Sequence, residues 1–151
     1  MINLINNFIN NTNFQSIINL ITNKNFPWFI KTFDKHIEFN HTLKNSMFAP
    51  PIIEEILKKI NATNLYDAKI KLITKTEKSL KLSTYNEYDK NSKKRCAIFY
   101  LNSNNGTTNI SGNKNIQSTE NSILILPSNT SFYETTCTDK ACRKLIHIIY
   151  D

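Results

Sequence analysis

Paired cysteines, a basic leader and a long apolar run are all missing from the sequence. Cys96, Cys137 and Cys142 are an odd number, and no two of them form a C-x-x-C pair. This argues against a disulfide framework or a zinc site and favours a reducing compartment. The first residues contain neither a basic leader nor an unbroken apolar stretch, so no signal peptide is expected. No stretch approaches the roughly 18 to 20 apolar residues of a membrane-spanning helix, so no membrane partner is expected either.

Glycine is scarce as well, with only two residues against an abundance of Asn, Lys and Ile. Such a bias is typical of AT-rich genomes, which many phages, other viruses and some bacteria have. The 40% hydrophobic and 21% charged residues are typical of a soluble globular protein. A length of 151 residues suits one domain that buries its own core. We therefore expect a single domain from a phage or virus, located in the host cytoplasm or the virion.

The formal net charge is +7, and a basic protein of this size is a candidate for binding nucleic acid or an anionic surface. The densest basic cluster lies in a predicted loop: Lys90, Lys93, Lys94 and Arg95. Tyr85 and Tyr88 lie beside it, so base stacking with phosphate neutralisation is one alternative. Charge alone specifies no partner, and a solvated basic surface is the preferred interpretation.

The first third of the chain is predicted to be helical and the remainder to form strands. Apolar residues recur at three- and four-residue spacing in residues 14–22, which predicts an amphipathic helix. Residues 51–60 predict a second helix, with Pro51 in its first turn and lysines near its end. Short apolar or alternating runs predict strands at 68–74, 96–101, 122–126 and 143–150. Asn105-Gly106 and Gly112-Asn113 are typical of hairpin turns between strands.

Five short strings, in order, resemble those of prolyl-hydroxylase-type oxygenases that depend on 2-oxoglutarate and Fe(II), especially short phage versions. They are FPWF at 26–29, CAIFYLN at 96–102, NNGTT at 104–108, ENSILILPS at 120–128, and TCTD at 136–139 followed by Arg143. The resemblance implies an α+β fold with a double-stranded β-helix (jelly-roll) core and N-terminal helices packed on its major sheet. It describes the single domain 1–151 as a mainly helical layer at 1–62 and a β core at 63–151.

The resemblance also implies three iron ligands, an H-x-D pair and a second His about ten residues before the Arg, which leave positions open for co-substrate and oxygen. The H-x-D pair should fall within 83–89, where no His occurs. The second His should lie at Phe132, whose ring cannot coordinate iron, although a shift of two residues would place Glu134 there. His36 and His41 lie outside the predicted barrel strands and are assigned surface or structural roles. No catalytic or metal-binding residue is therefore predicted.

The co-substrate half of the implied pocket is better preserved. Arg143 corresponds to an Arg that binds the distal carboxylate of 2-oxoglutarate through two parallel hydrogen bonds, and Tyr100 matches a tyrosine that donates to the same carboxylate. His147 shares a strand face with Arg143 and is interpreted as a hydrogen-bonded barrel histidine. These three residues form a predicted vestigial 2-oxoglutarate pocket. Alternatively, Arg143 pairs with Glu134 or Asp139, because an unpaired buried guanidinium is costly.

Two functions follow from these residues. The first is a catalytically inactive oxygenase-like domain, a pseudoenzyme without a cofactor, used for binding or assembly with a protein partner or another copy of itself. The second is an active prolyl hydroxylase-type oxygenase that uses Fe(II) and 2-oxoglutarate with rewired ligands, for example Glu87, Asp89 or Glu134 together with His147. Carboxylates alone hold Fe(II) loosely, which favours the first function.

Overall fold

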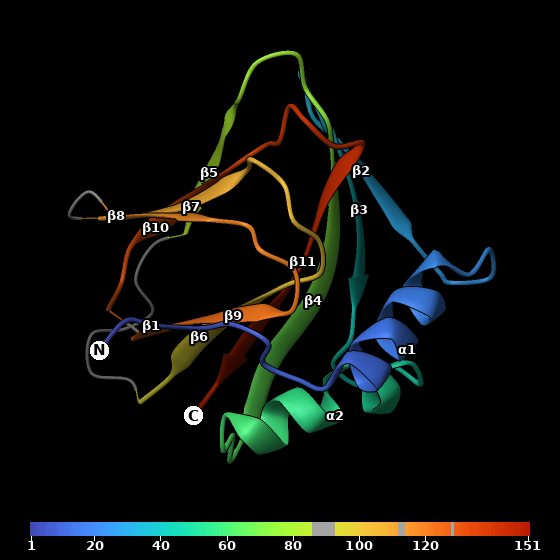
Figure 1. Cartoon of the computed structure of the whole chain (residues 1–151), viewed down its shortest axis with the longest axis vertical. Helices are drawn as coiled ribbons and strands as arrows, with labels where there is room; N and C mark the ends of the chain where they lie inside the picture. Colours follow the sequence, from blue (N-terminus) through green and yellow to red (C-terminus); the bar gives the residue numbers. More distant parts are fainter. Residues whose placement is uncertain (86–92, 112–113, 128) are drawn as a thin grey trace.

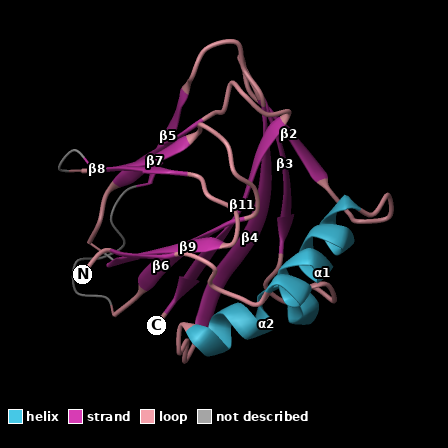
Figure 2. Cartoon of the chain, viewed as in Figure 1, coloured by secondary structure: helices cyan, strands magenta, loops and turns pink. Residues whose placement is uncertain are grey.

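A computed structural model describes residues 1–85, 93–111, 114–127 and 129–151. In this part of the chain two antiparallel sheets face each other, and two helices cover the outer side of the larger sheet (Figure 1). Figure 2 shows both helices on the same side of the strands, away from the space between the sheets. The predicted α+β arrangement, with N-terminal helices on the major sheet, is confirmed.

Both predicted helices form, and each buries one apolar stripe. Helix α1 (Asn11–Thr22) begins three residues earlier than predicted, because the Asn10 side chain accepts a hydrogen bond from the Asn13 backbone N–H. Helix α2 (Ala49–Lys59) has proline in its first turn and Lys58 and Lys59 in its last. No helix in the described residues is long and apolar enough to cross a membrane.

The larger sheet contains all four strands predicted at 68–74, 96–101, 122–126 and 143–150. Its order is β1 (Asn3–Ile5), β9 (Ser122–Pro127), β6 (Arg95–Tyr100), β11 (Cys142–Tyr150), β4 (Leu65–Thr74), β3 (Ile37–Thr42) and β2 (Phe29–Thr32). Three of these strands, β1, β2 and β3, come from residues 1–62. This N-terminal region therefore contributes strands to the major sheet as well as the predicted helical layer.

The smaller sheet has the order β5 (Lys81–Tyr85), β10 (Phe132–Thr135), β7 (Thr107–Ile110) and β8 (Lys114–Gln117). Along the chain from β4 to β11, most connections cross from one sheet to the other. This alternation produces the double-stranded β-helix, so the predicted core is confirmed.

The predicted hairpin at Asn105-Gly106 is wrong. The strands on either side, β6 and β7, belong to different sheets and do not pair. The segment is instead a crossover between the sheets. The second predicted turn, Gly112-Asn113, lies outside the described residues, although its flanking strands β7 and β8 pair antiparallel.

Strand β11 separates two cores because its side chains alternate between the faces of the larger sheet. Ile146 and Ile148 pack with the helices, whereas Leu145 and Ile149 point into the barrel. Strand β4 alternates in the same way, and its lysine face turns toward the barrel mouth. Lys71 on that face is only 8% exposed. At this residue the lysine-bearing face is therefore buried, whereas the polar face of a half-buried strand would be exposed to solvent.

Candidate functional site

The buried centre of the barrel is organised around Arg143, which is fully buried near the start of β11. Its Nε donates to Ser118 Oγ at 2.9 Å, and its Nη1 donates to the carbonyl oxygens of Thr107 at 3.0 Å and Thr135 at 2.8 Å. Its Nη2 donates to Thr108 Oγ1 at 3.0 Å. All three guanidinium nitrogens therefore bond to the chain itself, which fixes the orientation of the group.

Gly106 explains how the crossover after β6 closes over this arginine. A Cβ atom at Gly106 would lie 2.8 Å from Arg143 Cδ and 2.8 Å from Asn104 Oδ1. Both distances are shorter than real Cβ contacts, so a larger residue would force the backbone away from the guanidinium. The Gly106 N–H also bonds to Asn104 Oδ1 at 2.9 Å. The backbone at residue 106 can approach Arg143 this closely only because glycine has no side chain.

Glu134 supplies the negative charge next to Arg143. It lies on the inward face of β10, is fully buried, and places Oε1 3.6 Å from Arg143 Nη2. Its Oε2 lies 3.2 Å from His147 Nε2. Asp139, the other acid considered for this role, is exposed and accepts from the Asn105 backbone N–H at 3.0 Å. Of the two acids proposed to pair with Arg143, Glu134 is the one that lies beside it.

The electrostatics of this trio keep the carboxylate charged. Burial raises the pKa of Glu134, but the positive charges of His147 and Arg143 outweigh this effect and hold the pKa well below its usual range. Burial lowers the pKa of His147 more than the neighbouring Glu134 raises it. The Glu134 carboxylate and the Arg143 guanidinium then form a buried ion pair.

Tyr100 completes the centre from β6. Its hydroxyl lies 2.8 Å from Thr108 Oγ1, the same atom that accepts from Arg143. The face of its ring lies 5.8 Å from Arg143 Cζ, within the range of a cation–π contact. Burial raises the pKa of the Tyr100 hydroxyl, so it stays protonated at neutral pH. The structure thus brings together the three predicted pocket residues, Arg143, Tyr100 and His147, with Glu134 among them.

One position that the resemblance assigns to an iron ligand, Phe132, lies within the described residues. Phe132 is the first residue of β10, pairs with Tyr85 at the end of β5, and contacts the His147 ring edge-on at 6.1 Å between centroids. Residues 83–85 continue β5, whereas Asn86, Glu87 and Asp89 lie outside the described residues.

Among the side chains that are described, no group of three or more His, Cys, Asp or Glu residues could hold a metal ion. Glu134 and His147 do lie together, but the Arg143 guanidinium next to them disfavours a second cation. At this position the described part of the chain brings two candidate ligands together, Glu134 and His147.

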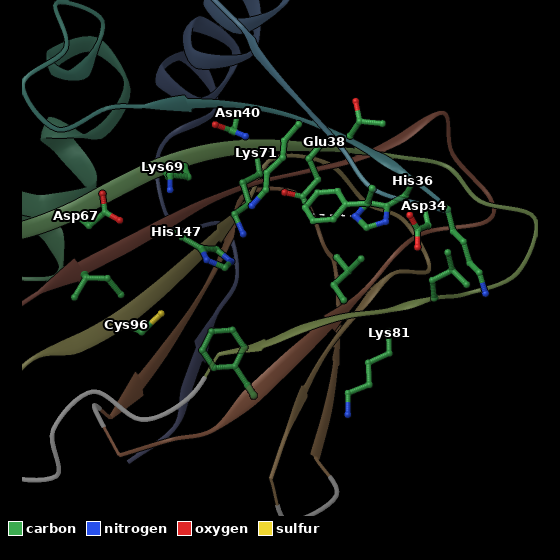
Figure 3. Close-up of a pocket in the computed structure, with 18 of the residues that line it drawn as sticks. Asp34, His36, Glu38, Asn40, Asp67, Lys69, Lys71, Lys81, Cys96 and His147 are labelled. Carbon is green, nitrogen blue, oxygen red and sulfur yellow. Dashed lines mark hydrogen bonds and ion pairs between the residues drawn. The ribbon is translucent and has the colours of Figure 1, made fainter.

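A hollow of about 910 Å³ opens above this centre, at the mouth of the barrel (Figure 3). His147 and Phe132 belong to its lining, whereas Arg143 and Tyr100 do not. Figure 3 shows His147 beside Lys71, with His36 and Glu38 further along the same wall. Of the three predicted pocket residues, His147 is therefore the one that reaches the hollow.

The remaining histidines have different roles. His41 in β3 lies between two partners, with Nδ1 2.8 Å from the Pro27 carbonyl oxygen and Nε2 2.8 Å from Ser46 Oγ. This confirms its structural role. His36 lines the hollow instead, with Nε2 3.3 Å from Glu38 Oε1. No sequence pattern predicts that His36 lines the hollow. Its place results from the pairing of β3 with β4, which brings the β2–β3 turn to the barrel mouth.

The predicted basic cluster falls only partly on described residues. Lys90 and Tyr88 lie outside them. Lys94 places its amino group 4.4 Å from the centre of the Tyr66 ring, and Arg95 begins β6. The nucleic-acid alternative stays a prediction.

Comparison with known proteins supports the architecture. No protein-family model matches the sequence, and no curated protein matches it either. Solved structures do match. A prolyl hydroxylase from Trichoplax adhaerens, in complex with a peptide fragment of the hypoxia-inducible factor oxygen degradation domain, has a TM-score of 0.75 at 10% identity, over 99% of this chain and 82% of its own. A prolyl-4-hydroxylase from Pseudomonas putida has a TM-score of 0.64 at 8% identity, over 99% of this chain and 91% of its own.

A third similar structure is the α-ketoglutarate-dependent carbocyclase SnoK of nogalamycin biosynthesis, with a TM-score of 0.72 at 10% identity, over 99% of this chain and 78% of its own. The chain has the fold of the 2-oxoglutarate- and iron-dependent oxygenases. At these identities the match concerns the oxygenase fold alone, so the chemistry has to be argued from the residues inside this oxygenase-like barrel.

Proposed function

We propose that this chain is a catalytically inactive oxygenase-like domain, used for binding or assembly. The observation that carries the proposal is the buried Glu134 carboxylate, 3.6 Å from Arg143 and 3.2 Å from His147. Arg143, Tyr100 and His147 are then a vestigial co-substrate pocket, in which a carboxylate of the chain itself occupies the place of a bound dicarboxylate. A second carboxylate would be repelled by Glu134 and would have to compete for an arginine whose nitrogens are already bonded.

The ligand positions support the same proposal. The side chain at the start of β10 is the Phe132 ring, which offers no lone pair to a metal. No catalytic residue and no cofactor is part of the proposed role. The Asn-, Lys- and Ile-rich composition supports an origin in a phage or virus, where the protein acts in the host cytoplasm or the virion.

The proposed partner is a protein or a second copy of this chain. Strand β2 lies at the edge of the larger sheet, and Phe29 and Ile30 on it are 63% and 68% exposed. An exposed edge strand with apolar side chains is a common site of strand addition. One structurally similar prolyl hydroxylase is itself in complex with a peptide, which supports a protein ligand for this fold.

The first test is turnover. Protein purified anaerobically and supplied with Fe(II), 2-oxoglutarate and oxygen should produce no more succinate than a control without enzyme. Succinate production well above that control would replace this proposal with an active prolyl hydroxylase-type oxygenase that uses rewired ligands. Glu87 and Asp89 would then be the first candidate ligands to substitute.

The second test addresses the internal carboxylate. Calorimetric titration with 2-oxoglutarate should show no binding to the unaltered chain and measurable binding to Glu134→Gln, because the amide removes the repulsion next to Arg143. Glu120→Gln, which removes an exposed carboxylate, is the matched control and should behave like the unaltered chain. Equal affinity of the unaltered chain and Glu134→Gln would show that Glu134 does not close the pocket.

A further inference from the structure

The two helices leave part of the outer face of the larger sheet uncovered. Strands β3 and β4 carry buried residues such as Ile70 beneath the helices, and Figure 1 shows the upper ends of both strands extending beyond the helices. The first open row of side chains crosses four paired strands: Lys144 on β11, Leu72 on β4, Phe39 on β3 and Ile30 on β2.

This open part of the face is apolar. Leu72 and Phe39 are half-buried, and Ile30 is 68% exposed. Ile37, two residues before Phe39 on the same face of β3, is 39% exposed. Single apolar residues on a surface are ordinary, but neighbouring ones on one face form a patch, and larger patches mark contact sites. We call Leu72, Phe39, Ile30 and Ile37 the open strip.

A groove of about 350 Å³ borders the open strip where α1 ends. Its apolar lining consists of Ile21, Phe26, Trp28 and Leu72. Trp28 is half-buried and held in place, because its Nε1 donates to the Ile21 carbonyl oxygen at 3.3 Å and its ring lies 4.9 Å from the Phe26 ring between centroids. A positioned and partly exposed tryptophan beside a groove is a typical anchor of a protein interface.

The charges of this groove have one sign. In the described part of the chain its lining contains Lys24 and Lys144 but no Asp or Glu, and neither lysine forms a salt bridge with another described residue. An apolar groove with two unneutralised lysines favours a partner that brings acidic side chains. A second copy of this chain, with its own net charge of +7, is disfavoured.

The spacing of the open strip fits a helix. Paired strands lie about 4.8 Å apart, so Leu72 and Ile30, two strands apart, are separated by about 10 Å. Seven residues of an α-helix rise about 10.5 Å. A helix that crosses the strands therefore places three side chains of one stripe over Leu72, Phe39 and Ile30. One further turn brings an acidic residue of that helix over Lys144, the neighbour of Leu72 on β11.

We propose that the open strip binds an acidic amphipathic helix of a partner protein, as a third helix beside α1. The apolar stripe of that helix packs on Trp28, Leu72 and Ile30, and its acidic residues pair with Lys24 and Lys144. The inference rests on the binding role proposed above and names the partner and the surface for it. It differs from strand addition, which uses the backbone edge of β2 and not the outer face of the sheet.

Trp28 provides a direct readout, because it is the only tryptophan of the chain. The probe is a synthetic peptide without tryptophan, about 18 residues long so that it is helical alone, with a leucine stripe and glutamates on its other face. Titration of the full chain at low salt should shift the Trp28 emission to shorter wavelength and saturate at equal amounts of peptide and chain. The affinity should fall as salt is added.

A peptide with the same leucines and with lysines in place of the glutamates is the control. It should bind roughly tenfold or more weakly, because the groove lysines repel it. Equal binding of the two peptides, or binding of neither, would overturn the inference.

A pair of apolar variants locates the contact on the strip. Ile30→Ser should weaken binding of the glutamate peptide by roughly tenfold or more, because a buried apolar contact is lost. Leu4→Ser removes an exposed apolar side chain from β1, at the opposite edge of the same sheet, and should change the affinity less than about twofold. Equal weakening in both variants would contradict a contact at the strip.

A charge-matched pair separates the groove from the general basicity of the chain. Lys24→Gln/Lys144→Gln should weaken binding by roughly tenfold, because two charge-assisted hydrogen bonds are lost. Lys58→Gln/Lys114→Gln removes the same charge from exposed positions outside the groove and should change the affinity less than about twofold. If the first variant fails to fold by circular dichroism, Lys24→Gln replaces it, with Lys58→Gln as its control. No difference between the paired variants would overturn the inference.

The other occupants of this region give different results. The Phe33 N–H donates to the His36 carbonyl oxygen at 3.0 Å, so strand alternation directs the N–H groups of Ile30 and Thr32 away from β3. Thr32→Pro removes one of these donors and should leave helix binding unchanged. Lost binding in Thr32→Pro with full binding in Ile30→Ser would assign the contact to the strand edge. A dimer of the unaltered chain in light scattering that Ile30→Ser dissociates would identify a second copy as the occupant. Either result would overturn the inference.

The turnover and 2-oxoglutarate experiments described above report on the barrel interior and use no peptide. Succinate production together with retained helix binding would remove the proposed inactive role and leave the partner surface in place. Absence of both would leave the inactive role and remove this surface. The two failures are therefore distinguishable.

Discussion

The two faces of the larger sheet differ sharply in chemistry although the same strands supply both. The face under the helices is apolar, and the Phe99 ring there makes edge-on contacts with Phe8 at 6.2 Å and Phe14 at 6.1 Å between centroids. The face inside the barrel carries Arg143 and His147, with Glu134 opposite them. One face holds the helices in place, and the other holds a buried set of charges.

This difference indicates where function lies. Apolar contacts are non-directional, and such a core tolerates exchange of residues of similar size. A buried charge is tolerated only when it is paired and hydrogen-bonded. Removing one member of the set therefore leaves another charge without its partner. The helix-covered face therefore serves stability through interchangeable apolar contacts, while the barrel interior tolerates a change of its charged residues least.

The largest expected effect comes from breaking the charged face. Arg143→Met leaves Glu134 buried without its partner and should lower the free energy of unfolding by about 3 to 5 kcal/mol. Urea denaturation followed by circular dichroism measures this loss. In the double variant Arg143→Met/Glu134→Gln the loss should be smaller than the sum of the two single losses, because the charges depend on each other. Additive losses would show that the charges do not interact.

An intermediate effect is expected on the apolar face. Ile148 is fully buried against the helices, so Ile148→Ala should lower the free energy of unfolding by about 2 to 4 kcal/mol through the cavity that it leaves. Ile148→Val, which removes one methyl group, should cost about 1 kcal/mol. Neither variant should bind 2-oxoglutarate in calorimetric titration, because both leave Glu134 next to Arg143. Binding of 2-oxoglutarate by either variant would show that the apolar face also controls the pocket.

The smallest expected effect is the pH dependence of the charged face. Burial lowers the pKa of His147 from its ordinary 6.5, so the unfolded chain takes up this proton first as the pH falls. Stability should therefore be complete above about pH 6.5 and decline below it. The lowered pKa of Glu134 adds a second decline below its ordinary 4.5.

Thermal unfolding measured from pH 8 to pH 3 tests this pH dependence. His147→Gln should remove the decline that starts near 6.5 and keep the one below 4.5. Ile148→Val on the other face should keep both. An unchanged upper decline in His147→Gln would assign it to another group.

The helices and central strands were predictable because each carries its own apolar period. Residues 14–22 and 51–60 repeat at helical spacing, and both became helices with one buried stripe. Strands β2 and β3 were missed, since β2 is an edge strand with every residue exposed and no alternation to reveal it. Their presence in the sheet depends on pairing with β4, a contact between distant segments that local patterns do not record.

The site was only partly predictable. The order of the five strings pointed to Arg143 and Tyr100, and Glu134 was one of two acids considered as the partner of the arginine. The sequence could not show whether Glu134 or Asp139 pairs with Arg143, because the pairing depends on which face of β10 meets β11 across the barrel. The lysines at the mouth were read as surface charge, since sequence alternation shows that Lys69 and Lys71 share a face but not which space that face borders.

The sequence by itself determined the helices, the central strands and the fold class, because these depend on residue type and on local spacing. The tertiary structure alone decided that Glu134 lies against Arg143 and that His36 and His147 line one hollow. Both facts are distances between residues far apart in the chain. Such distances arise only when the two sheets close into a barrel.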